Sequence, residues 1–244
     1  MLKLLTEKMP DVAEETPFGC KIASAAAAYG LHEPFEQFWA QEGGAVLAKI
    51  DSEALLTGAK DMNVEEIQAF LRTLDIRKLS CDEETARRLG MPAAVQGEIM
   101  VLHPEHIAKG TYADIRENPG PREIYAVLEQ AESETFPVPE FEPFYMDLSF
   151  RTRHGAALSV GVNMGDRLAA CAVCSAITES AAVIASVACV PGLRRHGYGR
   201  TAVAALAEKL NRKNVYIFRA EGENEEFYRF LGFEPYGHWA EIHF

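Results

Sequence analysis

The 244-residue sequence predicts a mixed α/β fold of the α+β type, in which helices flank a mixed β-sheet. Three features of the C-terminal half support this prediction. Three strand-like runs follow one another, and the third stops at a Pro-Gly turn. An Ala- and Leu-rich helical segment follows that turn directly. A strand, a short helix and a last strand then complete the chain.

The individual elements of the C-terminal half follow from hydrophobic periodicity and turn residues. Pro121 suits the first turn of a helix, and Gly165 with Asp166 predicts a hairpin turn between two alternating runs. Gly232 marks the end of a short helix rich in acids at its start. The expected helices are 121–132, 141–151, 201–210 and the one before Gly232, and the expected strands are 158–164, 168–177, 181–190, 214–219 and 238–244.

The N-terminal half shows a similar outline with weaker signals. We therefore expect two mixed-sheet domains in tandem, 1–105 and 106–244, with the Pro- and Gly-containing segment 103–121 at their boundary. An unrelated α+β domain is the alternative for the first half. The expected helices here are 19–29, 64–74 and 82–89, and the expected strands are 35–40, 45–50, 54–57 and 78–80.

Composition indicates an ordinary soluble globular protein, with 48% hydrophobic and 25% charged residues. The sequence has no run of 18 apolar residues, and charges follow closely on residues 1–5, which themselves include Lys3. We therefore expect neither a membrane span nor a signal peptide, and a cytoplasmic location. A formal net charge of −12 disfavours a nucleic-acid partner, because phosphates repel a net anion. The oligomeric state stays open, a homodimer included.

Cysteine and histidine spacing does not predict a metal site. Cys171 and Cys174 lie three positions apart on an expected strand, so they should point to opposite faces of the sheet. His103 and His106 have no further ligand nearby in the sequence, which favours a linker over a zinc site. The odd number and apolar surroundings of the cysteines favour reduced, buried thiols. The five are Cys20, Cys81, Cys171, Cys174 and Cys189.

The turn after the third strand has the chemistry of an anion site. Gly197 and Gly199 allow a tight turn and a close approach of a ligand to the backbone. The helix that follows presents N–H groups and the positive end of its dipole. Arg194, Arg195 and Arg200 add positive charge. Together these features predict a diphosphate-binding turn.

Two common nucleotide-binding motifs do not fit these residues. A Walker loop requires G-x-x-x-x-G-K-[ST], and no Lys-Ser or Lys-Thr pair follows the two glycines. A Rossmann fingerprint requires a third glycine, where this chain has Ala202. The pattern that fits is Arg-x-x-Gly-x-Gly, formed by Arg194, Gly197 and Gly199.

This pattern, between a strand and a helix, resembles motif A of the GNAT superfamily of acyl-CoA N-acyltransferases. Members of that family bind the pyrophosphate of coenzyme A on this turn, whereas a plain strand–turn–helix connection is the alternative. The resemblance implies that pantetheine runs beside the strand end and that the diphosphate lies on the turn. The implied coenzyme-binding residues are Cys189, Val190, Arg194, Arg195, His196, Gly197, Tyr198, Gly199 and Arg200.

A second motif follows, and its tyrosine, Tyr228, comes 29 residues after Gly199. Phe227-Tyr228-x-x-x-Gly232-Phe233 resembles motif B of the same family, in which the tyrosine commonly protonates the departing thiolate of coenzyme A. The resemblance implies that Tyr228 is the general acid. The alternative is that Tyr228 only packs on one face of an amphipathic helix.

The sequence departs from the family pattern before Tyr228. The usual asparagine lies about seven residues before the tyrosine, and this chain has Glu221 there. Asn224 lies four residues before Tyr228. We place Asn224 in the coenzyme site, with a simple helix cap as the other interpretation.

A second departure concerns the general base. Many relatives carry a glutamate on the strand that leads into motif A, whereas 181–190 contains no acid. Deprotonation of an amine would then require a water chain or a side chain from elsewhere. Glu142, Asp147 and His238 are open candidates.

The resemblance implies an N-acetyltransferase that moves an acetyl group from acetyl-CoA, without a metal, to a primary amine of a small molecule or peptide. A non-catalytic acyl-CoA-binding regulatory protein is the alternative. The resemblance also implies a tandem arrangement in which 106–244 is the catalytic domain and 1–105 a degenerate copy. The turn after Thr57 lacks R-x-x-G-x-G, and Ala86 stands four residues before Gly90, where motif B would have its tyrosine.

Overall fold

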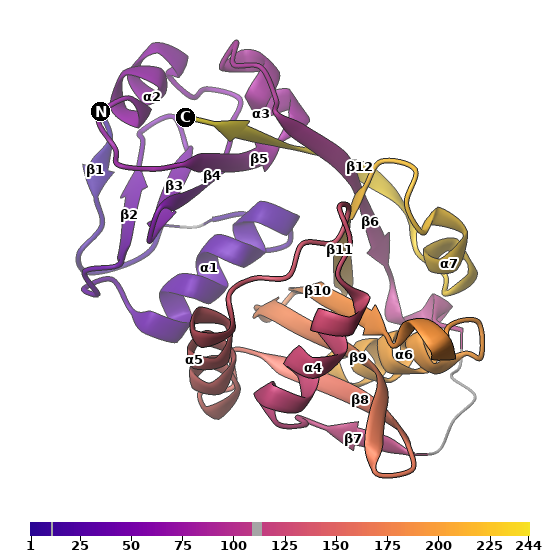
Figure 1. The fold of residues 1–244 in the computed structure, drawn as a ribbon. Helices are drawn as coiled ribbons and strands as arrows, with labels where there is room; N and C mark the ends of the chain where they lie inside the picture. The colour runs from indigo at the N-terminus through magenta and orange to yellow at the C-terminus, as the bar shows by residue number, and fades with distance from the viewer. Residues whose placement is uncertain (11, 109–113) are drawn as a thin grey trace. The chain divides into compact units, whose positions relative to one another are not determined.

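The computed structural model describes residues 1–10, 12–108 and 114–244 (Figure 1). It divides into two compact units. Unit 1 comprises Met1–Ile99, Phe218–Glu221 and Pro235–Phe244, and unit 2 comprises Met100–Ile217 and Gly222–Glu234. The chain therefore passes between the units more than once.

These units differ from the expected division at residue 105, because the end of the chain is part of unit 1. Strand β12 (Glu234–His243) pairs antiparallel with β5 (Lys78–Asp82), from Trp239 opposite Asp82 to His243 opposite Lys78. Such pairing of distant strands leaves no local mark in the sequence.

Unit 1 contains a meander followed by a parallel strand. Strands β2, β3 and β4 pair antiparallel in succession, and β4 pairs parallel with β5. The short strand β1 pairs with β2 at the other side. Strand β6 contributes residues to both units. The bounds are β1 (Lys3–Leu4), β2 (Glu36–Ala40), β3 (Val46–Ile50), β4 (Glu53–Thr57) and β6 (Val95–Leu102).

Helices cover both faces of the unit 1 sheet. Helix α1 (Pro17–Tyr29) packs through Ile22 and Ala25 on Phe38 of β2. Helices α2 (Val64–Leu71) and α3 (Glu83–Arg88) pack in a separate cluster that includes Leu47 and Leu79. The expected helix 64–74 ends early, because the N–H groups of residues 73 and 74 donate to carbonyls only three residues back.

Unit 2 has the same order of meander, crossover helix and parallel strand. Strands β7, β8, β9 and β10 pair antiparallel in succession, and β11 pairs parallel with β10 after helix α6. The strand bounds are β7 (Ile115–Glu117), β8 (Leu158–Met164), β9 (Arg167–Ile177), β10 (Ala181–Cys189) and β11 (Asn214–Ala220). The helix bounds are α4 (Pro121–Ala131), α5 (Phe141–Arg153), α6 (Tyr198–Leu210) and α7 (Glu225–Phe230).

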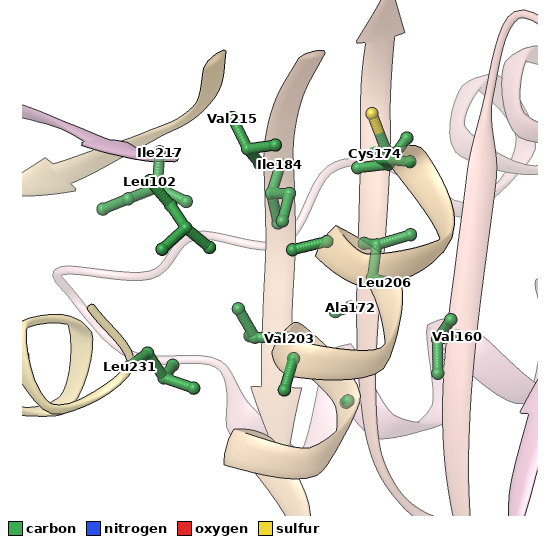
Figure 2. Close-up of a cluster of buried hydrophobic side chains, with 14 of the residues drawn as sticks. Leu102, Val160, Ala172, Cys174, Ile184, Val203, Leu206, Val215, Ile217 and Leu231 are labelled. Carbon is green, nitrogen blue, oxygen red and sulfur yellow. The ribbon is translucent and has the colours of Figure 1, made fainter. Parts of the chain in front are cut away.

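The core of unit 2 has two layers, one on each face of the sheet. Ala172 and Cys174 of β9 belong to the cluster that α6 covers through Val203 and Leu206 (Figure 2). Cys171 belongs to the other cluster, under α4 and α5. The prediction that Cys171 and Cys174 point to opposite faces is confirmed.

Three strands were not expected from the sequence: β1, β6 and β7. Strand β6 contains Gly97, a residue that usually weakens a strand. A Cβ on Gly97 would lie 2.1 Å from the carbonyl oxygen of Arg219, so the glycine permits a close approach of two backbones. In the part of the chain that the structure describes, no helix is long and apolar enough to cross a membrane.

Candidate functional site

Strand β10 is irregular just before the predicted diphosphate turn. Ile184 lies opposite Cys174 and Val187 lies opposite Ala172, so β10 has one residue more than β9 between these pairs. This is a β-bulge, a feature often found next to functional sites. Ala185 within the bulge is exposed although Ile184 is buried. The bulge therefore opens β10 to solvent.

The turn that follows is held by contacts within unit 2. The Val190 N–H donates to the Ala169 carbonyl at 2.9 Å and fixes the end of β10 on β9. A single 3-10 turn, Pro191–Leu193, comes next. The guanidinium of Arg194 reaches back to the Cys189 carbonyl at 3.5 Å.

The backbone then reverses into helix α6. Arg195 adopts a left-handed conformation with φ of 66°, and the Nδ1 atom of His196 lies 2.8 Å from the Arg194 carbonyl. Gly197 is the N-cap residue with φ of 92°, a value that strains any residue with a side chain. This left-handed backbone conformation therefore explains why position 197 is a glycine.

Helix α6 begins at Tyr198, three residues earlier than expected, so the second half of motif A is helical. Its first turn contains no acidic residue, and no side chain caps it from Gly197. Such a helix start, with the positive end of the dipole behind it, suits an anion.

Gly199 has no explanation within the chain itself. It lies in regular helix, so its backbone conformation does not require glycine. A Cβ at this position would lie 3.8 Å from Cζ of Phe227 and 3.9 Å from Cβ of Cys189, which are ordinary contact distances. Glycine at such a place is the usual solution where a ligand approaches the backbone.

Helix α7 holds Tyr228 in a packed aromatic cluster. Its side chain is 9% exposed and meets Phe227 and Phe233 edge to face, with ring centroids 5.0 and 5.5 Å away. Gly232 ends the helix with φ of 100°, and a Cβ there would lie 2.4 Å from the His106 carbonyl oxygen. The position of the Tyr228 ring is therefore tightly fixed.

Asn224 occupies the N-cap position of α7. Its backbone is left-handed, with φ of 55°, and its side chain makes no cap hydrogen bond. The side chain is exposed. Asn224 thus stands at the cap position that one interpretation gave it, but its side chain does not form the capping hydrogen bond.

The two predicted motifs come together in unit 2. The ring of Phe227 lies against Gly199, and the guanidinium carbon of Arg200 lies 4.9 Å from the centroid of Phe230. The first turn of α6 is thus contacted by α7. Phe230 was not expected from the sequence as a site residue, although an aromatic residue on the outer face of a short helix is a visible signal.

Cys189 is the one cysteine of the five that is not fully buried. Burial raises the pKa of its thiol, although Arg194 and a backbone hydrogen bond from Gly199 act in the opposite direction. The thiol therefore stays protonated near neutral pH. It lies at the junction of strand and turn and is not set up as a nucleophile.

The candidate bases have different surroundings. Asp147 forms an ion pair with Arg151 at 2.8 Å, and Glu142 lies exposed in the first turn of α5. His238 belongs to unit 1 and lies 3.7 Å from Glu83. Among the described residues no three His, Cys, Asp or Glu side chains gather as metal ligands. His103 instead contacts the Lys213 carbonyl at 3.1 Å.

The corresponding turn of unit 1 is closed. Gly58 follows β4, and a Cβ on it would lie 2.0 Å from Oγ1 of Thr85. The Asn63 side chain caps helix α2 by accepting from the Glu66 N–H at 3.0 Å. Thr85 therefore fills the space beside Gly58, and Asn63 caps the start of the helix. At Gly199 the corresponding space is not filled in this way, and no side chain of the N-cap residue caps α6.

Comparison with known proteins agrees with this architecture. Residues 122–233 match the model of the acetyltransferase (GNAT) family, and this part of the chain belongs to that family. No match is found among curated protein sequences.

Solved structures resemble the chain over nearly its whole length. A GCN5-related N-acetyltransferase from Kribbella flavida is similar with a TM-score of 0.65 and 17% identity, over 92% of this chain and 95% of that one. A tandem GNAT protein from the clavulanic acid biosynthesis pathway is similar with a TM-score of 0.58 and 15% identity, over 99% of this chain and 97% of that one. A GCN5-related N-acetyltransferase from Sphaerobacter thermophilus is similar with a TM-score of 0.57 and 13% identity, over 98% of this chain and 94% of that one. At these identities the likeness shows a shared fold, including a tandem arrangement.

Proposed function

We propose that the protein is an N-acetyltransferase that transfers the acetyl group of acetyl-CoA to a primary amine of a small molecule or peptide. The observation that supports this most is Gly199, a glycine that neither backbone strain nor crowding requires. It lies at an uncapped helix start after a basic turn, in the part of the chain that matches the acetyltransferase family. An acyl-CoA diphosphate fits that chemistry.

The coenzyme would lie along the path from β10 to α6. Its diphosphate would accept hydrogen bonds from the backbone of the turn at Gly197 to Arg200, with Arg194 and Arg195 supplying positive charge. Its pantetheine amides would pair with the backbone of β10 beyond Ile184, where the pairing with β11 ends and the strand continues to Cys189 and Val190. Asn224 at the exposed start of α7 would complete this binding surface.

The reaction would be a direct transfer. The neutral amine attacks the thioester carbonyl, the new C–N bond forms, and the C–S bond breaks as the thiolate of coenzyme A leaves. A backbone N–H of β10 would stabilise the oxyanion, and Tyr228 would give its phenolic proton to the thiolate. The fixed ring of Tyr228 suits a positioned proton donor.

The amine must also lose a proton to a base. No acid lies on β10, and Asp147 is already paired with Arg151. A water chain or Glu142 would accept this proton. Unit 1 would have a structural role or shape the acceptor site, since its own turn after β4 is filled by Thr85.

The rival proposal is a non-catalytic protein that binds acyl-CoA as a regulatory ligand. The burial of Tyr228 and the absence of an acid on β10 are the observations in its favour. The test is release of free thiol from acetyl-CoA with a panel of primary amines, run beside titration of acetyl-CoA by calorimetry. Amine-dependent thiol release supports the enzyme. Binding without release with any amine would support the regulatory protein, and absence of binding would refute both.

A further inference from the structure

Lys21 is a half-buried lysine of unit 1 whose amine lies beside two aromatic rings. It is in the second turn of α1, and its Nζ atom lies 4.9 Å from the ring centroid of Phe218 and 6.0 Å from that of Phe18. The two rings meet edge to face, with centroids 5.4 Å apart. Among the described residues the amine forms neither a hydrogen bond nor an ion pair. The side chain thus ends against aromatic carbon and not against an oxygen.

The charged groups closest in character to a partner for Lys21 are engaged with one another. The Nζ atom of Lys78 lies 2.9 Å from a carboxylate oxygen of Glu53 and 3.4 Å from one of Glu241. The other oxygen of Glu241 lies 2.7 Å from Nε2 of His243. Lys78 therefore takes the ion pairs on this part of unit 1, and Lys21 serves the fold through no ion pair of its own.

This setting disfavours the charged form of the Lys21 amine. An ammonium that leaves water without an acceptor loses its hydration, and aromatic faces replace only part of that loss. Burial accordingly lowers the pKa of Lys21 from its ordinary value. Glu53 opposes this shift and Lys78 adds to it, while Cys20 and Glu241 act in the same direction as Glu53. More of Lys21 is therefore the neutral, nucleophilic amine than in an ordinary lysine.

We propose that Lys21 is a modification site, at which the amine takes the acyl group of a small thioester directly from solution. The nitrogen lone pair attacks the thioester carbonyl carbon and forms the C–N bond of an amide. The C–S bond breaks, the thiolate leaves with its electron pair, and the proton lost by the nitrogen passes to water. The product is a neutral amide beside Phe18 and Phe218, so a poorly solvated charge is removed. The reaction needs no coenzyme site and does not rest on the proposed function.

The first test follows acetylation of each lysine by mass spectrometry of peptides. The whole protein is incubated at neutral pH with S-acetyl-N-acetylcysteamine, a thioester without a nucleotide part. Lys49, a half-buried lysine on β3 of the same unit, is the matched control. Lys21 should be acetylated at least about 10-fold faster than Lys49, because a tenfold larger fraction of neutral amine gives a tenfold higher rate.

The second test uses two variants of the neighbouring ion pair, which should have opposite effects on Lys21. Glu53→Gln removes a carboxylate that favours the ammonium, so acetylation should be about 2- to 5-fold faster. Lys78→Gln removes a like charge and releases the Glu53 carboxylate, so acetylation should be slower by about the same factor. A general loosening of unit 1 would instead accelerate the reaction in both variants. Circular dichroism checks that both keep the wild-type melting temperature.

Three outcomes would overturn the proposal. Acetylation of Lys21 no faster than that of Lys49 would show that its surroundings do not activate the amine. A shift in the same direction in Glu53→Gln and Lys78→Gln would show that electrostatics do not control its reactivity. Acetylation by acetyl-CoA but not by S-acetyl-N-acetylcysteamine would show transfer from a bound coenzyme instead of direct reaction with a thioester in solution.

Discussion

The ring of Phe227 lies against Gly199, with its Cζ atom 3.8 Å from the place where a Cβ would stand. The glycine of one motif thus lies against the first aromatic residue of the other, although Phe227 comes 28 residues after Gly199 in the sequence. The space above Gly199 is bounded by Phe227 and Cys189 but not filled by them. A methyl group would fit the protein there, so folding and coenzyme binding can be tested separately at this position.

Gly199→Ala should leave the fold intact and impair the coenzyme site. The new methyl group meets only ordinary contacts, and alanine favours helix over glycine, so the melting temperature should stay or rise slightly. Affinity for acetyl-CoA should fall about 10-fold or more, because the methyl displaces a ligand hydrogen-bonded to the helix start. Thermal unfolding and calorimetry on the same sample check both.

Gly197→Ala is the matched comparison for that variant. Its φ of 92° forces a side chain into a left-handed conformation, at a cost of about 1–2 kcal/mol. This variant should therefore lose stability as well as affinity. Wild-type affinity in Gly199→Ala would show that the glycine does not serve ligand approach.

The sequence predicts what is local and misses what is distant. Turn residues and periodicity place strands β2 to β4, strands β8 to β10 and the crossover helices of both units. Gly197 is recognised because its left-handed backbone conformation by itself favours glycine. Strand β6 is missed because the reason for Gly97, the carbonyl of Arg219, lies far along the chain. The pairing of β12 with β5 and the contact of Arg200 with Phe230 are missed for the same reason. The acceptor site has no sequence signature that identifies it.

Thiol modification should report on the coenzyme site through Cys189. The other four cysteines are buried, and burial raises the pKa of Cys81 and Cys171 to about 12. In the native protein iodoacetamide should therefore label Cys189 alone, as mass spectrometry of peptides will show. Only the thiolate reacts. Because the pKa of Cys189 is also raised, labelling should be slow at pH 7 and should accelerate as the pH rises toward that pKa.

Acetyl-CoA should slow the labelling of Cys189, since the proposed pantetheine path passes the end of β10. Cys189→Ser is the control that removes the labelled thiol with only a small change in side-chain volume. Equal labelling rates with and without saturating acetyl-CoA would contradict this path, while labelling of Cys171 would indicate that the native state opens readily.

A fragment comprising residues 106–244 should be poorly soluble. In the whole chain β12 pairs with β5, and its residues Ala240 and Ile242 are buried in a cluster with Leu79. The fragment leaves this strand with an unpaired edge and an exposed apolar face, which favours association between copies. Size-exclusion chromatography should show aggregates.

Residues 106–234, which lack β12, are the comparison for that fragment. Removing the strand should reduce aggregation if the edge is its cause. A monomeric 106–244 fragment with the stability of the whole protein would contradict the structural role of unit 1.

Tyr228→Phe should separate catalysis from packing. The ring of Tyr228 meets Phe227 and Phe233 edge to face, and phenylalanine keeps these contacts and removes only the hydroxyl group. A thiolate is already a fair leaving group, so loss of one proton donor should lower kcat about 10²–10⁴-fold rather than abolish turnover. Affinity for acetyl-CoA and the melting temperature should stay close to wild type.

Tyr228→Ala is the contrasting variant: loss of the buried ring should cost about 3–5 kcal/mol of stability, so its lower activity would not be diagnostic. Steady-state kinetics with an amine found in the thiol-release panel supplies the measurement. If Tyr228→Phe turns over at the wild-type rate, Tyr228 only packs in the core, and protonation of the thiolate must come from water.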